Sequence, residues 1–368
     1  MKLSAPKFLT PLQPYLRNRK VQIGGAVVLV LAVAGTITGV ALAGGNGKTA
    51  PAAITTSGPA PLPTTSAPTT SEAPVATTSP LTGGAPSNNG VVAVKIDDTG
   101  NGRPQMNIDK ADIVYIEQVE GGLTRLLAVF NSQLPKVEAV RSTRDADPEI
   151  LAQYGPIAYV ASGGAPFPLQ VLHSSPLKAN IMDAGDPGFV RDNNRPAPYN
   201  VIGDLTEIAK ATKAPKAKDI GLTFSADTAA AAAAPFAHTI HTQVGNTNVD
   251  FVFDTATKAY QRVIDGVPQT TADGKKIEAI NVVVQFCKSD VDNRDVDVNG
   301  NPSQFTHTTG SGQVAVFRNG HELKGTWKRA ADKDGTTLTG ADGAPIALAP
   351  GNTWFALAAT GNPLTVAK

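Results

Sequence analysis

The sequence is poor in cysteine and has no excess of charge of either sign. Cys287 is its one cysteine among 368 residues, so a disulfide within the chain is excluded. The 32 Lys and Arg residues nearly balance the 31 Asp and Glu residues, which gives a net charge of +1. A nucleic-acid-binding protein normally has a basic face or tail, so we expect no nucleic acid among the partners.

Familiar catalytic motifs are missing as well. The sequence contains no G-x-S-x-G, H-E-x-x-H or C-x-x-C motif, so no classical hydrolase, zinc-peptidase or thiol-redox site is indicated. His238 and His241 have a spacing that could bind a metal, but we interpret them as incidental, and we predict neither a metal site nor a cofactor. Whether the chain is an enzyme is left undecided by these observations.

The N-terminal region predicts a membrane anchor. Residues 1–20 carry five basic residues and no acid, and residues 21–45 are apolar except for one Gln and two Thr. Such a run can cross a lipid bilayer as a helix, and the basic leader places the N-terminus in the cytoplasm. The alternative is a signal peptide cleaved after Ala43, but the run is longer than a typical signal-peptide core. We predict a retained single-pass anchor in the cell membrane, with the C-terminal part extracytoplasmic. No cysteine follows the span, so lipid attachment there is excluded.

Residues 46–90 predict a stalk. They are rich in Pro, Thr, Ser and Ala and carry only two charged residues, Lys48 and Glu72. A segment of this composition cannot bury enough apolar surface to offset its chain entropy. Its prolines favour extended polyproline II structure, so we predict a disordered but semi-rigid linker between the membrane and a globular part.

Beyond residue 90 the sequence predicts two globular regions of different secondary structure. Residues 91–235 predict an α/β (α+β) domain with a mixed sheet, in which a helix is expected to begin with Asp147 as N-cap and another to span residues 205–213. Residues 236–368 predict a β-rich domain, either an antiparallel sheet or a small barrel. Asp265-Gly266, Asn319-Gly320 and Asp342-Gly343 separate its strand candidates and are strong hairpin signals.

Charged side chains gather where two apolar runs, residues 123–130 and 137–140, begin or end. Arginine forks suit phosphate or carboxylate ligands, but arginines beside acids equally form ion-pair networks that hold a fold together. Both interpretations stay open. Ser162–Gly164 follow a buried strand, as ligand-binding turns of α/β sheets often do. The candidate ligand-binding residues are Glu117, Glu120, Arg125, Arg141, Arg144 and Asp145 near the two runs, and Arg191, Arg195 and Asn200 in a polar loop.

Several motifs give the globular part a family resemblance. In the first half they are ADIVYIEQVEGGLTRLLAVF (residues 111–130), VRSTR (140–144) and RPAPYN (195–200). In the second half they are NVVVQF (281–286), GSGQVAVFRNG (310–320), GTWK (325–328) and PGNTW (350–354). With these motifs, residues 91–368 resemble the YerB-like extracytoplasmic proteins of Gram-positive bacteria, a two-part domain of unknown function. Members are often lipoproteins, whereas this chain has a helical anchor, and the resemblance implies no activity.

We therefore predict a membrane-anchored module of the cell envelope that binds a cell-wall polymer or an envelope protein in an accessory role. The alternative is a transferase similar in layout to the LytR-CpsA-Psr type, which acts on a pyrophosphate-linked lipid wall precursor. That alternative requires a divalent cation, through Asp145 or Asp147, because the departing diphosphate accumulates charge.

Overall fold

The structure is a computed structural model that describes residues 77–226, 228–297 and 300–368. The predicted leader, anchor and most of the predicted stalk lie outside the described residues. Within the described part of the chain, no helix is long and apolar enough to cross a membrane.

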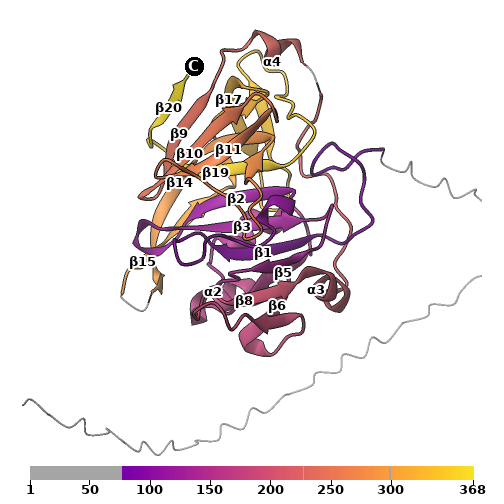
Figure 1. Ribbon diagram of the computed structural model, residues 1–368, viewed down its shortest axis with the longest axis vertical. Coiled ribbons are helices and arrows are strands. Elements are labelled where there is room, and N and C mark those ends of the chain that lie inside the picture. Colours follow the sequence, from indigo (N-terminus) through magenta and orange to yellow (C-terminus); the bar gives the residue numbers. More distant parts are fainter. Residues whose placement is uncertain (1–76, 227, 298–299) are drawn as a thin grey trace, which may run out of the picture. The chain divides into compact units, whose positions relative to one another are not determined.

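A mixed sheet of eleven strands runs through the described part (Figure 1). Its order is β18-β17-β16-β14-β19-β2-β3-β1-β5-β6, and β15 pairs with the far end of β14. The first half contributes β1 (Val92–Asp97), β2 (Ile113–Gln118), β3 (Thr124–Phe130), β5 (Ala158–Ala161) and β6 (Lys178–Ile181). The second half contributes β14 (Asn281–Val296), β15 (Pro302–His307), β16 (Gly310–Arg318), β17 (His321–Arg329), β18 (Thr337–Gly340) and β19 (Thr353–Ala359). The predicted mixed sheet and β-rich second half are confirmed.

Strand β19 joins the two halves of the sequence into one sheet. It runs parallel to β2, with Thr353 opposite Ile113, and parallel to β14 on its other side. Figure 1 shows the yellow β19 beside the purple β2. Strands from both predicted domains therefore share a sheet. Within its described residues, the second half forms no barrel and is divided between two sheets. Six of its strands form an antiparallel sheet of their own, as expected, whereas β14 to β19 join the large sheet because β19 pairs in parallel with β2.

Two smaller sheets complete the β structure. One has the order β12-β11-β10-β9-β20, with β13 paired to β11, and the other has the order β4-β8-β7. The bounds of the first are β9 (Thr239–Val244), β10 (Thr247–Asp254), β11 (Ala259–Ile264), β12 (Val267–Pro268), β13 (Glu278–Ala279) and β20 (Leu364–Ala367). Those of the second are β4 (Lys136–Glu138), β7 (Phe189–Arg191) and β8 (Val201–Asp204).

The helices are short. They are α1 (Asp147–Ala152), α2 (Pro166–His173), α3 (Leu205–Thr212) and α4 (Ala229–Ala233), with 3-10 turns η1 (Ile108–Lys110), η2 (Glu120–Gly122) and η3 (Met182–Ala184). The N-cap of α1 is Ala146, not the predicted Asp147, which is the first helical residue. The Asp147 carboxylate accepts the backbone N–H of Arg144, and it also binds the side chains of Lys95 in β1 and Tyr159 in β5.

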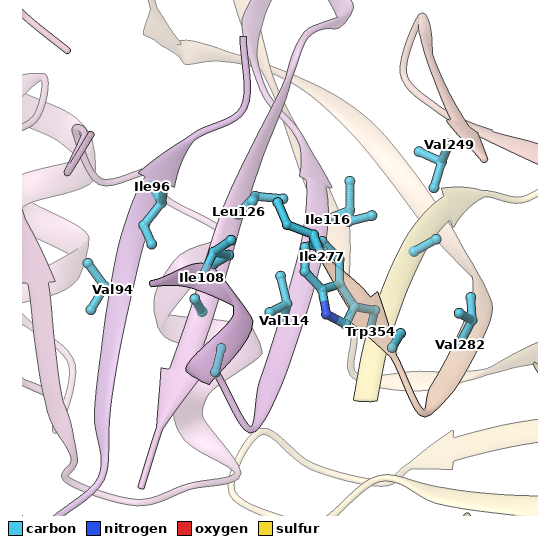
Figure 2. Close-up of a cluster of buried hydrophobic side chains, with 14 of the residues drawn as sticks. Val94, Ile96, Ile108, Val114, Ile116, Leu126, Val249, Ile277, Val282 and Trp354 are labelled. Carbon is cyan, nitrogen blue, oxygen red and sulfur yellow. The ribbon is translucent and has the colours of Figure 1, made fainter. Parts of the chain in front are cut away.

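The large sheet is buried on both faces. Alternate residues of β1 to β3, such as Val94, Ile116 and Leu126, pack against the six-stranded sheet and α3. The residues between them, such as Ala93 and Leu127, pack against α1 and α2. Figure 2 shows the first of these cores, where Ile116 and Ile277 lie near Trp354 of β19. Double-sided burial explains why these strands appear in the sequence as continuous apolar runs.

Candidate functional site

The ends of three central strands bring charges of both signs to one edge of the sheet. Strand β3 runs antiparallel to β1 and β2, so its first residues lie beside their last residues. Arg125 is opposite Asp97 of β1 on one side and opposite Glu117 of β2 on the other. Directly opposite residues point to the same face, so this register places one guanidinium between two carboxylates.

A fully buried ion pair lies next to this edge. The Nζ of Lys95 is 2.6 Å from Oδ1 of Asp147 and also contacts Oε1 of Glu117. Tyr159 donates its hydroxyl to Oδ2 of Asp147 at 2.5 Å. Burial lowers the pKa of Lys95 to about 8, against the opposing effect of Asp147. Sequence reasoning missed Lys95, although a charged residue inside the apolar run VVAVKI must find a partner if that strand is buried.

Each nitrogen of the Arg144 guanidinium contacts an oxygen atom of the protein. Its Nη2 donates to Oε2 of Glu120 at 2.7 Å, and its Nε contacts the other oxygen of the same carboxylate. Its Nη1 donates to the carbonyl oxygen of Thr143 at 2.7 Å. Asp295 of β14 also lies 3.7 Å from Nε. The predicted site was confined to the first half of the chain, whereas this cluster includes a carboxylate from the second half.

Arg125 and Arg141 are also engaged within the protein. Arg125 donates to the carbonyl oxygen of Ser142 at 2.9 Å, and burial lowers its pKa to about 10. Arg141 lies with Nε 3.0 Å from Oδ2 of Asp97, and its guanidinium is 5.1 Å from the centre of the Tyr199 ring. The three predicted arginines therefore come together as expected, each with an internal partner.

The polar loop contributes little to this cluster. Arg191 donates to the side-chain oxygen of Asn200 at 2.8 Å, which closes the loop on itself. Arg195 donates to the carbonyl oxygens of Gly102 and Pro104, at 3.0 and 2.8 Å. These three predicted residues act as braces, since their hydrogen bonds join the loop to itself and to the segment after β1. Tyr199 is the loop residue that reaches the arginine cluster.

The Ser162–Gly164 turn lies against the arginine segment, and packing explains one of its glycines. The N–H of Ser162 donates to the carbonyl oxygen of Arg141, and the N–H of Thr143 donates back to the carbonyl oxygen of Gly163. A Cβ atom on Gly163 would lie 2.2 Å from Oδ2 of Asp183, and one on Gly164 would lie 2.6 Å from Cγ2 of Thr143. The buried Thr143 therefore requires glycine at position 164, whether or not a ligand binds. At position 163 the clash is with the end of an exposed side chain, which can move aside.

Asp145 differs from the other acids of the cluster because no described residue forms an ion pair with it or donates a hydrogen bond to it. Its side chain is buried, with 2% of the residue exposed, and among the described residues no amide, hydroxyl or cationic group donates to either carboxylate oxygen. The carboxyl of Asp292 in β14 lies within hydrogen-bonding reach. Burial raises the pKa of Asp145 to about 7, and the acids Asp292, Asp295 and Asp147 add to the rise.

A groove of about 1170 Å³ opens beside this acid. It lies among α1, α2, β15 and the connection between β17 and β18, so both halves of the chain form its walls. Pro148, Phe167 and Phe305 are among its apolar lining residues, and Gln170 and Lys333 are among its polar ones. Apolar surface with a few polar groups is typical of ligand sites. Sequence reasoning missed the groove because its walls come from elements far apart in the chain.

The chemistry available at the arginine cluster is that of an ion-pair network. Within residues 77–226, 228–297 and 300–368, no group of three or more His, Cys, Asp or Glu side chains is arranged to hold a metal ion. Asp147 already accepts hydrogen bonds from Lys95, Tyr159 and the Arg144 amide. The open groove, with Asp145 at its edge, can accommodate a ligand of substantial size.

Comparison with known proteins supplies the family. One family model, described as "Protein of unknown function (DUF3048) N-terminal domain", matches residues 77–218. A second, described as "Protein of unknown function (DUF3048) C-terminal domain", matches residues 239–355.

A curated relative and a solved structure agree with these matches. The relative, from Bacillus subtilis (strain 168), is named "Putative lipoprotein YerB" and is 28% identical over 277 residues, which span 72% of this chain and 80% of the relative. The crystal structure of the YerB protein from Bacillus subtilis superposes with a TM-score of 0.66 at 23% identity, covering 79% of this chain and 99% of that one. The resemblance seen in the sequence motifs is confirmed, and the chain belongs to the DUF3048 family of YerB-like proteins.

Proposed function

We propose that the protein is a membrane-associated, extracytoplasmic accessory module that holds a cell-wall polymer in the groove beside α1 and α2. The groove itself carries this proposal. Its volume of about 1170 Å³ suits an extended polymer segment, and its walls combine two phenylalanines with amide, hydroxyl and charged side chains. Sugar rings and short peptides both offer apolar faces together with polar edges, which such a lining complements.

The name of the relative supports the proposed location outside the cytoplasm. The relative is named as a lipoprotein, which supports an association with the membrane. This chain has no cysteine near its N-terminus to carry a lipid, because its single cysteine is Cys287, in a buried strand. We therefore propose that the apolar residues 21–45 replace the lipid as the anchor.

The internal pairing of the arginines favours binding over group transfer. Arg125, Arg141 and Arg144 each have a partner within the protein, at 2.9, 3.0 and 2.7 Å respectively. A pyrophosphate would have to displace these partners, and separating a buried ion pair costs about 3–5 kcal/mol. No finding supports the transferase hypothesis, so the accessory module is the function we propose.

Sedimentation with purified cell wall tests this function. The full-length chain, kept in a mild detergent, is mixed with insoluble wall and the pellet is assayed for protein. Gln170→Trp fills the groove from the exposed side of α2, and His173→Trp adds the same side chain on that helix outside the groove lining. We expect the wild type and His173→Trp to sediment with the wall and Gln170→Trp to stay in solution, with no release of soluble fragments.

Three results would contradict the proposal in distinct ways. Equal retention of both variants would show that the groove is not the binding site. Failure of the wild type to sediment would exclude an insoluble wall polymer as the ligand. Release of glycan or peptide fragments would identify an enzyme.

A further inference from the structure

One wall of the groove is a hairpin that leaves the large sheet. Strand β14 pairs with β16 and β19 only as far as Gln285 and Cys287 respectively. From Lys288 onward it pairs with β15 alone, and its pairing shifts register between Asp292 and Val296. Phe305 of β15 lines the groove, so the position of this β14–β15 hairpin sets the width of the groove.

Contacts at different heights attach the hairpin to the first half of the chain. At its base, Glu149 of α1 accepts the N–H groups of Thr308 and Thr309, at 2.7 and 2.9 Å. Higher up, the guanidinium of Arg294 lies 4.5 Å from the centre of the Phe167 ring in α2. Both of these contacts are attractive.

The contact between Asp145 and Asp292 differs from these two, because both residues are acids. An ionised carboxylate only accepts hydrogen bonds, so two ionised carboxylates in contact repel each other. Asp292 is held ionised, because its oxygens accept the Nε–H of Arg294 at 2.8 and 3.0 Å and the backbone N–H of the same arginine at 2.8 Å. Asp145 has no such donor among the described residues and is buried. A stable contact between the two carboxyls therefore requires one proton, and geometry puts that proton on Asp145.

The other charged groups near Asp145 do not remove this requirement. Arg294 is the cation of the hairpin that interacts with Asp145, but its Nε is bound to both oxygens of Asp292. On its own side, Asp147 is paired with Lys95. From β14, Asp295 faces it but adds negative charge, and the nearby Arg144 is already bound to Glu120. Glu149, on the groove side, is occupied by the two threonine amides. His307 of the hairpin is another titratable group near α1. Its Nε2 lies 2.9 Å from Oδ2 of Asp290, and its Nδ1 lies 3.9 Å from Oε2 of Glu149.

We infer that Asp145 and Asp292 form a proton-dependent latch, in which the protonated carboxyl of Asp145 donates to Asp292 and holds the β14–β15 hairpin in place as a wall of the groove. Ionisation of Asp145 turns this hydrogen bond into a repulsion and frees the hairpin. The latch is a property of the fold, while its consequence for ligand access rests on the function proposed above.

The direction of the pH dependence follows from the environment. Burial and neighbouring acids raise the pKa of Asp145 to about 7 in the folded protein, above its ordinary value of 3.8. A group with a raised folded-state pKa stabilises the fold fully below its unfolded value, and this contribution is lost as the pH rises through 7. The pKa of Asp292 is lowered by Arg294, so its own contribution is lost only in strong acid.

Hydrogen exchange read by mass spectrometry tests the latch on the full-length chain at about pH 5.5 and about pH 8.5, after correction for intrinsic exchange rates. We expect wild-type residues 288–297 to exchange roughly tenfold faster at the higher pH. Asp145→Asn keeps a donor at every pH, so its hairpin should stay protected at both. Asp145→Ala has no donor, so its hairpin should exchange rapidly at both.

Matched variants separate the latch from the remaining titratable groups of the hairpin. Asp290→Asn removes an exposed carboxylate of the same hairpin and His307→Gln removes its imidazole, and both should retain the wild-type pH dependence. The latch is overturned if wild-type exchange is independent of pH, if Asp145→Asn behaves like Asp145→Ala, or if His307→Gln abolishes the dependence. Restored protection on adding calcium at the higher pH would also overturn it, since the pair would then bind a cation. Wall sedimentation at both pH values tests ligand access separately, so either proposal can fail while the other stands.

Discussion

Arg262 and Asp98 connect two sheets through a buried bidentate ion pair. The guanidinium of Arg262, in β11 of the six-stranded sheet, donates to both oxygens of Asp98 just after β1, at 2.8 and 2.7 Å. It also lies 5.3 Å from the centre of the Trp354 ring in β19. Thr124 of β3 donates to the same carboxylate at 2.8 Å. One residue of the second half thus contacts the end of β1 and strand β19, and it shares the Asp98 carboxylate with β3.

Replacing Arg262 should strongly destabilise the fold. Arg262→Met leaves the Asp98 carboxylate buried with one hydroxyl donor and no positive charge, which costs about 3–5 kcal/mol of unfolding free energy. Urea denaturation measures this loss. Lys276→Met in the same half is the control, because its pair with Asp254 is exposed to solvent and should contribute little to stability. Similar losses in the two variants would contradict the structural role assigned to Arg262.

The two neighbouring arginines of the candidate site should respond differently to lysine. Arg144→Lys keeps the charge but loses the fork that binds Glu120 and the Thr143 carbonyl, so we expect a loss of about 2–3 kcal/mol. Arg141 has a partly accessible side chain and one carboxylate partner, so Arg141→Lys should cost about 1 kcal/mol or less.

Thermal unfolding ranks these two variants, and wall sedimentation tests their roles. If Arg141→Lys keeps its stability but loses wall retention, Arg141 belongs to the binding surface. If both variants unfold early and bind normally when folded, the arginines serve the fold alone.

The buried Lys95 should be more important than any exposed lysine. Lys95→Met leaves Glu117 and Asp147 buried without their cation, and we expect a loss of about 3–5 kcal/mol in urea denaturation. Adding Glu117→Gln to this variant should recover part of the loss, because one uncompensated charge disappears. Lys136→Met is the control, since Lys136 is largely exposed and 3.7 Å from Asp204. A loss no larger than that of the control would argue against the buried pair.

Cys287 should be inert in the folded protein. Its side chain is fully buried in β14, and burial raises the pKa of the thiol well above its ordinary value. Thiolates, not thiols, react with disulfide reagents, so a colorimetric thiol assay should detect the group only after denaturant is added. Rapid labelling in native buffer would show that this end of β14 opens readily.

Much of the secondary structure follows from local patterns in the sequence. The apolar run 123–130 contains β3, and the helix expected over residues 205–213 is α3, which ends one residue earlier. Asp265-Gly266 and Asn319-Gly320 have positive φ at both positions, as the predicted hairpin turns require. Short, continuous apolar runs indicate strands that are buried on both faces, and this signal needs no knowledge of the partner strand.

Site residues were less accessible to prediction. Ion pairs between the arginines and nearby acids could be predicted from the sequence because the two partners lie within tens of residues of each other, as Glu120 and Arg144 do. Their role in binding stays a prediction. Lys95 was missed because one lysine in an apolar run does not reveal which acids will surround it. Asp292 and Asp295 were missed because they lie in the hairpin half of β14, whose path over the first half depends on distant contacts.

The sequence alone determined the predicted address, the family, the strand positions and the supply of acids beside arginines, because each depends on residue types at short separation. Tertiary structure alone decided that β19 inserts between β14 and β2, which unites both halves in one sheet. It also decided that Asp145 meets Asp292 at the edge of a groove. Pairings between distant segments are chosen by the packing of the whole core, so no local pattern encodes them.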